Sequence, residues 1–115
     1  MRLKNMSKTF STILFLILLT FFSTNAFAQT ATGTIEGTVT DKNGAVIPGA
    51  TVTIELSNNS AGFKKIVTTN ENGYFVFTEI PSGNYEIYAS AKGFDLLVKY
   101  VVVSSNTTTT NFTLS

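Results

Sequence analysis

Few side chains in this sequence have the chemistry needed for catalysis. The chain contains no histidine and no cysteine, which removes the commonest general base, the thiol nucleophile and most transition-metal sites. A carboxylate pair such as Glu36 and Glu55 could act as acid and base. Both glutamates, however, alternate with apolar residues, as side chains on the solvent-facing side of a β-strand do. The sequence therefore predicts a protein that is not an enzyme and holds no cofactor.

Two short segments offer oxygen ligands that would suit calcium. One contains Asp41 and Asn43, and the other contains Asn70, Glu71 and Asn72. The segments read Asp-x-Asn-Gly and Asn-x-Asn-Gly, and these are also the residues that tight turns require. Because each segment supplies too few carboxylates for a calcium site, the sequence predicts two turns and no metal.

Exposed aromatic side chains are the remaining candidates for a binding site. Tyr74 and Tyr88 occupy outward positions of predicted strands, and Tyr100 and Phe63 lie in the outward phase or near loops. Sugar rings stack on such aromatics. Tyrosine favours strands in any case, and the chain has no tryptophan, the usual platform for a sugar. Two binding functions therefore stay open, namely docking on other proteins through a sheet edge or the apolar segment Leu96–Val103, and binding of glycans through the outward tyrosines.

Seven strand-like segments position these residues. Apolar and polar residues alternate with a period of two between turns rich in glycine and asparagine, most clearly over residues 70–94. Segments spaced roughly 8–12 residues apart, without helical periodicity, predict an all-β, seven-stranded Greek-key sandwich of the prealbumin or immunoglobulin type. The predicted strands span residues 35–40, 50–56, 63–69, 74–78, 85–92, 96–103 and 108–114.

Three inward rows are expected to share one core between the two sheets. The segment Leu96–Val103 is different, because it is apolar in both phases. Its alternation does not say which face is buried. It is either a strand buried on both sides or a strand whose outer face packs on something else. The inward rows are Val52/Ile54/Leu56, Phe75/Phe77 and Tyr85/Ile87/Ala89.

The N-terminal residues have the layout of a secretory signal peptide. Basic residues at positions 2, 4 and 8 precede an apolar run, Thr12–Phe22, and small residues at positions 26 and 28 precede Gln29. The run is about 11 residues long, short of the roughly 20 that span a bilayer. We therefore expect a signal peptide over residues 1–28 cleaved between Ala28 and Gln29, a flexible leader over residues 29–33 and one domain over residues 34–115. The protein is then exported to the periplasm, the outer-membrane surface or the extracellular space, without a stable membrane span.

Removal of the signal peptide changes the charge of the protein. The whole chain carries a net charge of +1, but residues 29–115 hold five lysines against seven carboxylates, a net charge of −2. No basic cluster remains beyond the pair Lys64-Lys65, and phosphate binding needs several clustered cations. Nucleic acid is therefore not expected as a partner, which leaves proteins or glycans of the cell envelope.

Five spaced motifs resemble the carboxypeptidase regulatory-like domain. They are G-x-V-x-D-x-x-G and P-G-A-x-V within residues 37–54, followed by T-x-x-x-G-x-F-x-F, I-P-x-G-x-Y and A-x-G-F within residues 69–94. The resemblance implies a transthyretin-like sandwich, similar to starch-binding-like and collagen-adhesin B-type domains. Such domains occur beside peptidases, on bacterial surfaces and at the N-termini of TonB-dependent receptors. The resemblance therefore implies an accessory module and does not specify a ligand.

Some similar adhesin domains contain a lysine–asparagine isopeptide bond. In this chain Lys64, Lys65 and Asn111 are the residue types that such a bond requires. The bond also needs a desolvated lysine and a catalytic acid beside it, and no motif provides them. The sequence therefore predicts no cross-link at these residues.

Overall fold

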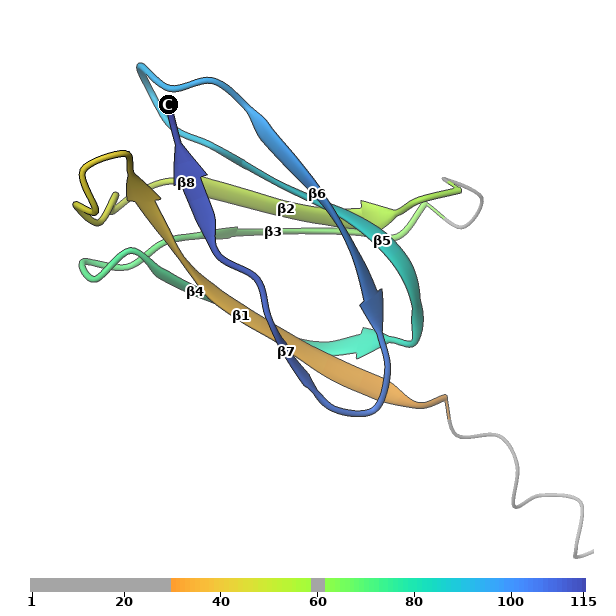
Figure 1. Ribbon diagram of the computed structural model, residues 1–115. Helices are drawn as coiled ribbons and strands as arrows, with labels where there is room; N and C mark the ends of the chain where they lie inside the picture. The colour runs from red at the N-terminus through yellow and green to blue at the C-terminus, as the bar shows by residue number, and fades with distance from the viewer. Residues whose placement is uncertain (1–29, 59–61) are drawn as a thin grey trace, which may run out of the picture.

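The computed structural model describes residues 30–58 and 62–115, which form two β-sheets packed face to face (Figure 1). The predicted signal peptide and its cleavage site, Ala28 and Gln29, lie outside the described residues. Among the described residues, no helix has both the length and the apolar character needed to cross a membrane. The all-β sandwich predicted from the sequence is confirmed.

Most strand pairs in the two sheets join strands that are not consecutive in the sequence, the exceptions being β2 with β3 and β5 with β6. The first sheet consists of β1 (Thr32–Asp41), β4 (Tyr74–Pro81), β7 (Thr107–Thr109) and β8 (Phe112–Leu114). In it, β1 pairs antiparallel with β4 and parallel with β7 and β8. The second sheet has the order β3-β2-β5-β6, with every pair antiparallel. Its strands are β2 (Thr51–Leu56), β3 (Lys64–Thr68), β5 (Gly83–Ser90) and β6 (Leu97–Val103).

The C-terminal strand is divided, so the described chain has eight strands and the prediction of seven is wrong by one. Between β7 and β8 the chain leaves the ladder, and Thr110 lies directly against Gly37 of β1. A Cβ atom added at Gly37 would lie 1.8 Å from the carbonyl oxygen of Thr110. Only glycine permits this approach of two backbones. Asn111 fills the break, since its Oδ1 accepts a hydrogen bond from the N–H of Thr38 at 3.0 Å.

The sandwich begins slightly earlier than the sequence indicates. Thr32 and Gly33, which the sequence assigns to the leader, are paired with Pro81 and Ile80 of β4. The carbonyl of Ala31 also accepts a hydrogen bond from the N–H of Ser82 at 3.0 Å. The N-terminal end of β1 is therefore part of the first sheet.

The core lies between the two sheets and contains the predicted inward rows. Each row alternates with exposed or half-buried residues, apart from the buried Thr53 between Val52 and Ile54, as expected for strands with one face toward the core. Leu56 is the exception, since it is half-buried and packs at the margin of the core. The buried apolar residues are Ile35, Val39, Ala50, Val52, Ile54, Phe75, Phe77, Ile80, Tyr85, Ile87, Ala89, Val103, Phe112 and Leu114.

The two predicted turns share one hydrogen-bond pattern. In both, the side-chain Oδ1 of the first residue, Asp41 or Asn70, accepts the N–H groups two and four positions later, at 2.9 and 3.0 Å. The turn residues Gly44 and Gly73 have φ angles of 82° and 70°. One side-chain oxygen in each turn, on Asp41 or Asn70, thus accepts two backbone N–H groups of the turn itself. The described residues contain no group of three or more potential metal ligands.

Glu79 has the one positive φ angle, 56°, among the non-glycine residues that the structure describes. It lies in a β-bulge, where the register between β1 and β4 shifts between Gly33 and Ile35. A side chain in this left-handed region is strained by about 1–2 kcal/mol. The bulge therefore forms at an energetic cost to the fold.

Replacing Glu79 with glycine is expected to raise the free energy of unfolding by about 0.5 kcal/mol. The relief of backbone strain exceeds the extra entropy that glycine gives the unfolded chain, about 0.4–1 kcal/mol. The matched control is Thr78→Gly, at the neighbouring bulge position whose φ angle is not positive, where a loss of about 0.5–1 kcal/mol is expected. Urea denaturation of the three proteins measures the difference, and equal losses in both variants would contradict this account.

Candidate binding surface on the second sheet

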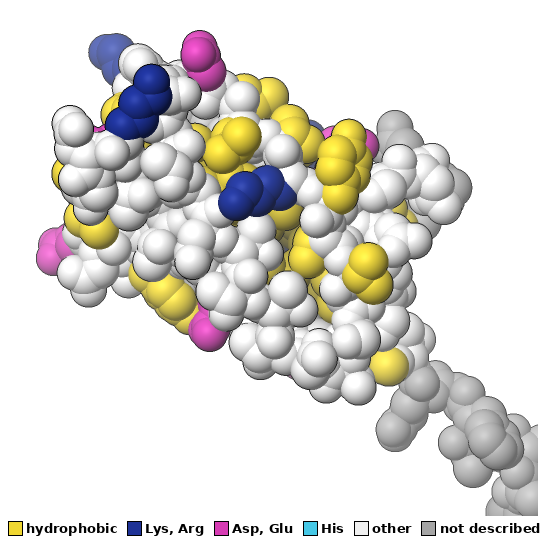
Figure 2. All heavy atoms as spheres, viewed as in Figure 1, with side chains coloured by type: hydrophobic (Ala, Val, Ile, Leu, Met, Phe, Trp, Pro, Cys, Tyr) yellow, Lys and Arg dark blue, Asp and Glu magenta, His cyan; other side chains and the backbone are white. Residues whose placement is uncertain are grey.

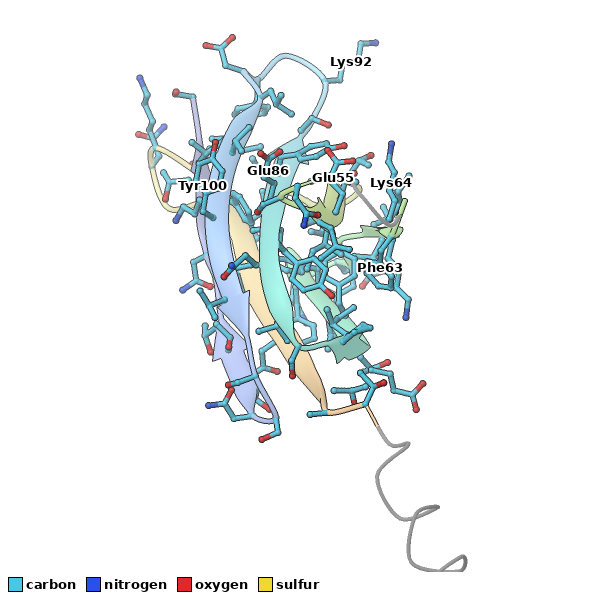
Figure 3. All side chains as sticks on the ribbon, turned by 90° about the vertical axis from the view of Figure 1, so that its right-hand side faces the viewer. Glu55, Phe63, Lys64, Glu86, Lys92 and Tyr100 are labelled. Carbon is cyan, nitrogen blue, oxygen red and sulfur yellow. The ribbon has the colours of Figure 1, made fainter. Side chains whose placement is uncertain are left out.

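Outward side chains of the second sheet form rows that run across its four strands. One row consists of Lys64 on β3, Glu55 on β2, Glu86 on β5 and Tyr100 on β6, which are successive partners in the strand register. Figure 3 shows these four side chains following one another across the sheet. Cross-strand partners point to the same side of a sheet, with Cβ atoms about 4.5–5.5 Å apart. The four side chains therefore form one continuous surface.

The apolar end of this surface lies on β6, an edge strand whose described partner is β5. Its inward apolar residues Leu97, Val101 and Val103 pack in or against the core. Its outward residues Val98, Tyr100 and Val102 have exposed fractions of 41%, 76% and 68%. Figure 2 shows apolar side chains gathered over this strand. The sequence left open which face of residues 96–103 is buried. In the isolated chain one face of this strand is buried, and the other is apolar but uncovered.

Tyr88 borders the same surface. In the register it lies between Thr53 of β2 and Val98 of β6, and it is half-buried. Thr53 is only 4% exposed although it points outward, because Tyr88 on one side and Ile66 on the other flank it. We refer to the surface formed by Glu86, Tyr88, Val98, Tyr100 and Val102 as the β6 face.

Tyr74 does not belong to the β6 face. It lies on β4 in the first sheet, and its hydroxyl donates a hydrogen bond of 2.7 Å to Oε2 of Glu36 on β1. Tyr74 and its partner Glu36 therefore both lie on the first sheet, on the opposite side of the sandwich from the β6 face. Of the three predicted binding tyrosines, the fold brings Tyr88 and Tyr100 together and separates Tyr74 from them.

The hydrogen bond to Glu36 raises the pKa of Tyr74 above the ordinary tyrosine value of 10.0, because the carboxylate stabilises the protonated hydroxyl. Desolvation of the hydroxyl and repulsion between the tyrosinate and the Glu36 carboxylate raise this pKa further. A pKa raised by folding contributes stability that is present below pH 10.0 and is lost as pH rises through the higher, folded-state pKa. Between about pH 9 and pH 11, the native protein should lose more stability than the Tyr74→Phe variant. Urea unfolding at both pH values measures this, and equal losses would contradict it.

Phe63 was expected as a possible sugar platform, and the structure corrects this. Its ring is half-buried and packs edge-on against Tyr85 of the core, with centroids 5.7 Å apart and an interplanar angle of 70°. Because part of the ring is buried against a core tyrosine, it is a poorer platform for a ligand than the exposed ring of Tyr100. Phe63 therefore contributes to the core between the sheets.

The carboxylate pair considered for catalysis is also separated. Glu36 points outward from the first sheet, where it accepts the Tyr74 hydroxyl, and Glu55 points outward from the second. The whole core lies between them, so they cannot act on one substrate. The carboxylate that does lie beside Glu55 is Glu86, its direct partner across β2 and β5.

The residues considered for an isopeptide bond are not assembled either. Lys64 and Lys65 lie on β3, and Nζ of Lys65 donates to the carbonyl oxygen of Thr78 at 3.3 Å. The lysine that reaches Asn111 is Lys99 of β6, whose Nζ donates to the backbone carbonyl of Asn111. This contact links β6 of the second sheet to the break between β7 and β8 in the first sheet.

The sequence indicates the apolar segment 96–103 as a possible docking surface, but it does not show which of its side chains face outward, and it gives no sign that Glu86 belongs to the same surface. The signal is the apolar run of β6, which continues in both phases. Its outward phase could be identified only from the pairing of β6 with β5, which places Val98 opposite Tyr88 and Val102 opposite Asn84.

The fold and the exposed sheet face together define a β-sandwich module of the transthyretin-like type. Residues 34–115 match the model of the carboxypeptidase regulatory-like domain, and the chain belongs to that family. This confirms the resemblance found in the sequence motifs. No curated protein sequence matches the chain.

Solved structures with this fold have diverse roles. A proposed carbohydrate-binding protein from Pseudomonas aeruginosa is 21% identical with a TM-score of 0.59, over 77% of this chain and 92% of that one. Another from Bacteroides uniformis is 15% identical with a TM-score of 0.58, over 73% and 41%. A 3-chlorocatechol 1,2-dioxygenase from Rhodococcus opacus is 14% identical with a TM-score of 0.61, over 75% and 60%. At such identities the likeness concerns the fold alone.

Proposed function

We propose that this protein is a non-catalytic accessory module that docks on a protein of the cell envelope through the β6 face. The observation that supports it is the exposure of Val98, Tyr100 and Val102 side by side on an edge strand. Uncovered apolar residues that are contiguous mark sites of interaction, whereas scattered ones do not. Burial of this strip against a partner would stabilise the complex by removing apolar surface from water.

Glycan binding is the second candidate, favoured by the exposed ring of Tyr100 beside the carboxylate of Glu86. The two structural neighbours described as proposed carbohydrate-binding proteins point in the same direction. Sugars, however, stack on aromatic rings and bond to polar groups, and the flanking Val98 and Val102 provide neither. An aromatic ring flanked by aliphatic side chains is therefore a better match for the surface of another protein than for a pyranose ring.

The test is retention of the purified protein on envelope membranes from the cells that produce it. The Tyr100→Ala, Val102→Ala double variant should bind at least about tenfold more weakly, since loss of a central aromatic anchor costs about 2 kcal/mol. The matched control is Val76→Ala, which removes a 38% exposed valine from the first sheet and should bind normally. Pretreating the membranes with protease should abolish retention. Retention that survives protease but is lost after periodate oxidation of sugars would replace this proposal with glycan binding.

Docking in the envelope requires export, which we propose on the basis of the N-terminal pattern. The protein recovered from cells should begin at Gln29, since residues 1–28 have the features of a cleaved signal peptide. Mass spectrometry of the intact protein and of its N-terminal peptide measures this directly. A protein that keeps residues 1–28 and remains in the cytoplasm would contradict it.

A further inference from the structure

The β6 face is apolar at its edge and acidic behind it. Glu86 lies directly opposite Tyr100 in the register, and Glu55 lies directly opposite Glu86. Like charges opposite each other on a sheet destabilise it. Neither carboxylate has a hydrogen bond or ion pair with another residue in the described part of the chain. Two adjacent carboxylates thus face solvent next to the most exposed large apolar side chain of the strip.

Lys64 does not neutralise this pair. It is the register partner of Glu55 on the side away from Glu86, and Figure 3 shows it at the far end of the row from Tyr100. The row therefore runs from one cation through two anions to an aromatic ring. The excess negative charge lies at the Glu86 end, where the apolar strip begins.

We infer that the partner docking on the β6 face presents an arginine side chain to this point, flanked by aliphatic residues. This inference rests on the proposed docking function and specifies its chemistry. A guanidinium placed over Tyr100 would gain a cation–π contact and could donate hydrogen bonds to Glu86 and Glu55 through its planar fork. Arginine suits the position better than lysine, because it stacks on aromatic rings and is more weakly hydrated. The flanking aliphatic residues would cover Val98 and Val102.

A second copy of this chain is a poorer occupant. Residues 29–115 contain no arginine. Of the two lysines close to this surface, Lys64 lies in the same acidic row and Lys99 of β6 is bonded to the carbonyl of Asn111 on the other side of the sheet. Charge complementarity therefore favours a different protein. Self-association is one of the outcomes that the test below distinguishes.

The test uses the ¹⁵N-labelled protein and the tripeptide acetyl-Val-Arg-Val-amide as probe. The matched probe replaces arginine with citrulline, which has the same shape and no charge. The arginine peptide should shift the backbone amide signals of β5 and β6 and bind about two- to fivefold more tightly than the citrulline peptide, the range expected for an exposed ion pair. The preference should decrease as salt concentration rises.

Variants assign the effect to the acidic pair. Glu86→Gln should remove most of the preference for the arginine peptide. Lys64→Gln should increase it, because a competing cation is lost from the row. The control Glu71→Gln neutralises an exposed carboxylate in the turn before β4 and should leave the preference unchanged. These side chains are on the surface, so all three variants are expected to fold.

The inference would be overturned by equal binding of the two peptides, by signal shifts confined to other strands, or by no shift up to about 20 mM peptide. Concentration-dependent broadening of β6 signals without peptide would indicate self-association and would also overturn it. If the peptides are not distinguished but envelope retention still depends on Tyr100 and Val102, only the arginine inference fails. If retention is independent of those residues, the proposed function itself fails.

Discussion

Replacing Phe75 with alanine is expected to lower the free energy of unfolding by about 3–5 kcal/mol. Phe75 is 2% exposed, and its ring centroid lies 6.0 Å from those of both Phe77 and Phe112. It therefore joins two strands of the first sheet, β4 and β8, that are not paired with each other. Truncation removes the ring from this contact and leaves a cavity between the strands.

A loss of this size is a large share of the stability of any small domain, which is typically about 5–15 kcal/mol. The region matched by the family is 82 residues long (34–115), and the chain has no cysteine to form a disulfide. Urea denaturation measures the effect as a lower midpoint with an unchanged slope. Val76→Ala is the matched control, because Val76 is the next residue of β4 and points outward; it should lose less than about 1 kcal/mol. A loss below about 1 kcal/mol for Phe75→Ala would show that the ring is not a central core residue.

Replacing Gly37 with alanine is expected to cost about 3 kcal/mol, the upper range for an added methyl group in a packed site. The new Cβ would lie 1.8 Å from the carbonyl oxygen of Thr110 and 3.0 Å from the ring of Phe75. The backbone between β7 and β8 would have to move away. The hydrogen bond from the N–H of Thr110 to the carbonyl of Glu36, now 2.8 Å, would be weakened.

The control for Gly37 is Gly44→Ala. Gly44 has a φ angle of 82° and no atom within 4 Å of an added Cβ, so its alanine variant reports backbone strain alone, about 1–2 kcal/mol. Urea unfolding compares the two. Hydrogen exchange should in addition show faster exchange in β7 and β8 of the Gly37 variant and unchanged exchange there in the Gly44 variant. Equal costs and unchanged C-terminal exchange would contradict the packing described for Gly37.

The alternation of apolar and polar residues was enough to predict the two-sheet core. Rows such as Phe75/Phe77 and Tyr85/Ile87/Ala89 are buried because the period of two fixes which side chains share a face. The division of the last strand was not predictable in the same way. It depends on Thr110 meeting Gly37, a contact between residues far apart in the sequence, and both β7 and β8 have ordinary strand composition.

The candidate site was predicted only in part, for a related reason. The outward phase of Tyr74, Tyr88 and Tyr100 followed from local pattern, but the sheet to which each belongs did not. Tyr74 is bonded to Glu36, 38 positions away, whereas Tyr88 and Tyr100 lie on adjacent strands. Pairing between strands decides which outward residues form a surface, and a single sequence does not encode that pairing locally.

The most direct test of the β6 face as the docking surface is site-specific photo-crosslinking in the cells that produce the protein. A benzophenone amino acid is placed at position 100 in one variant and at position 76, on the opposite sheet, in a second. The account predicts one discrete protein adduct from position 100, absent from position 76 and lost when Val98 and Val102 are also changed to glutamate. An adduct that forms from position 76 instead, or one from position 100 that is indifferent to the two glutamates, would contradict it.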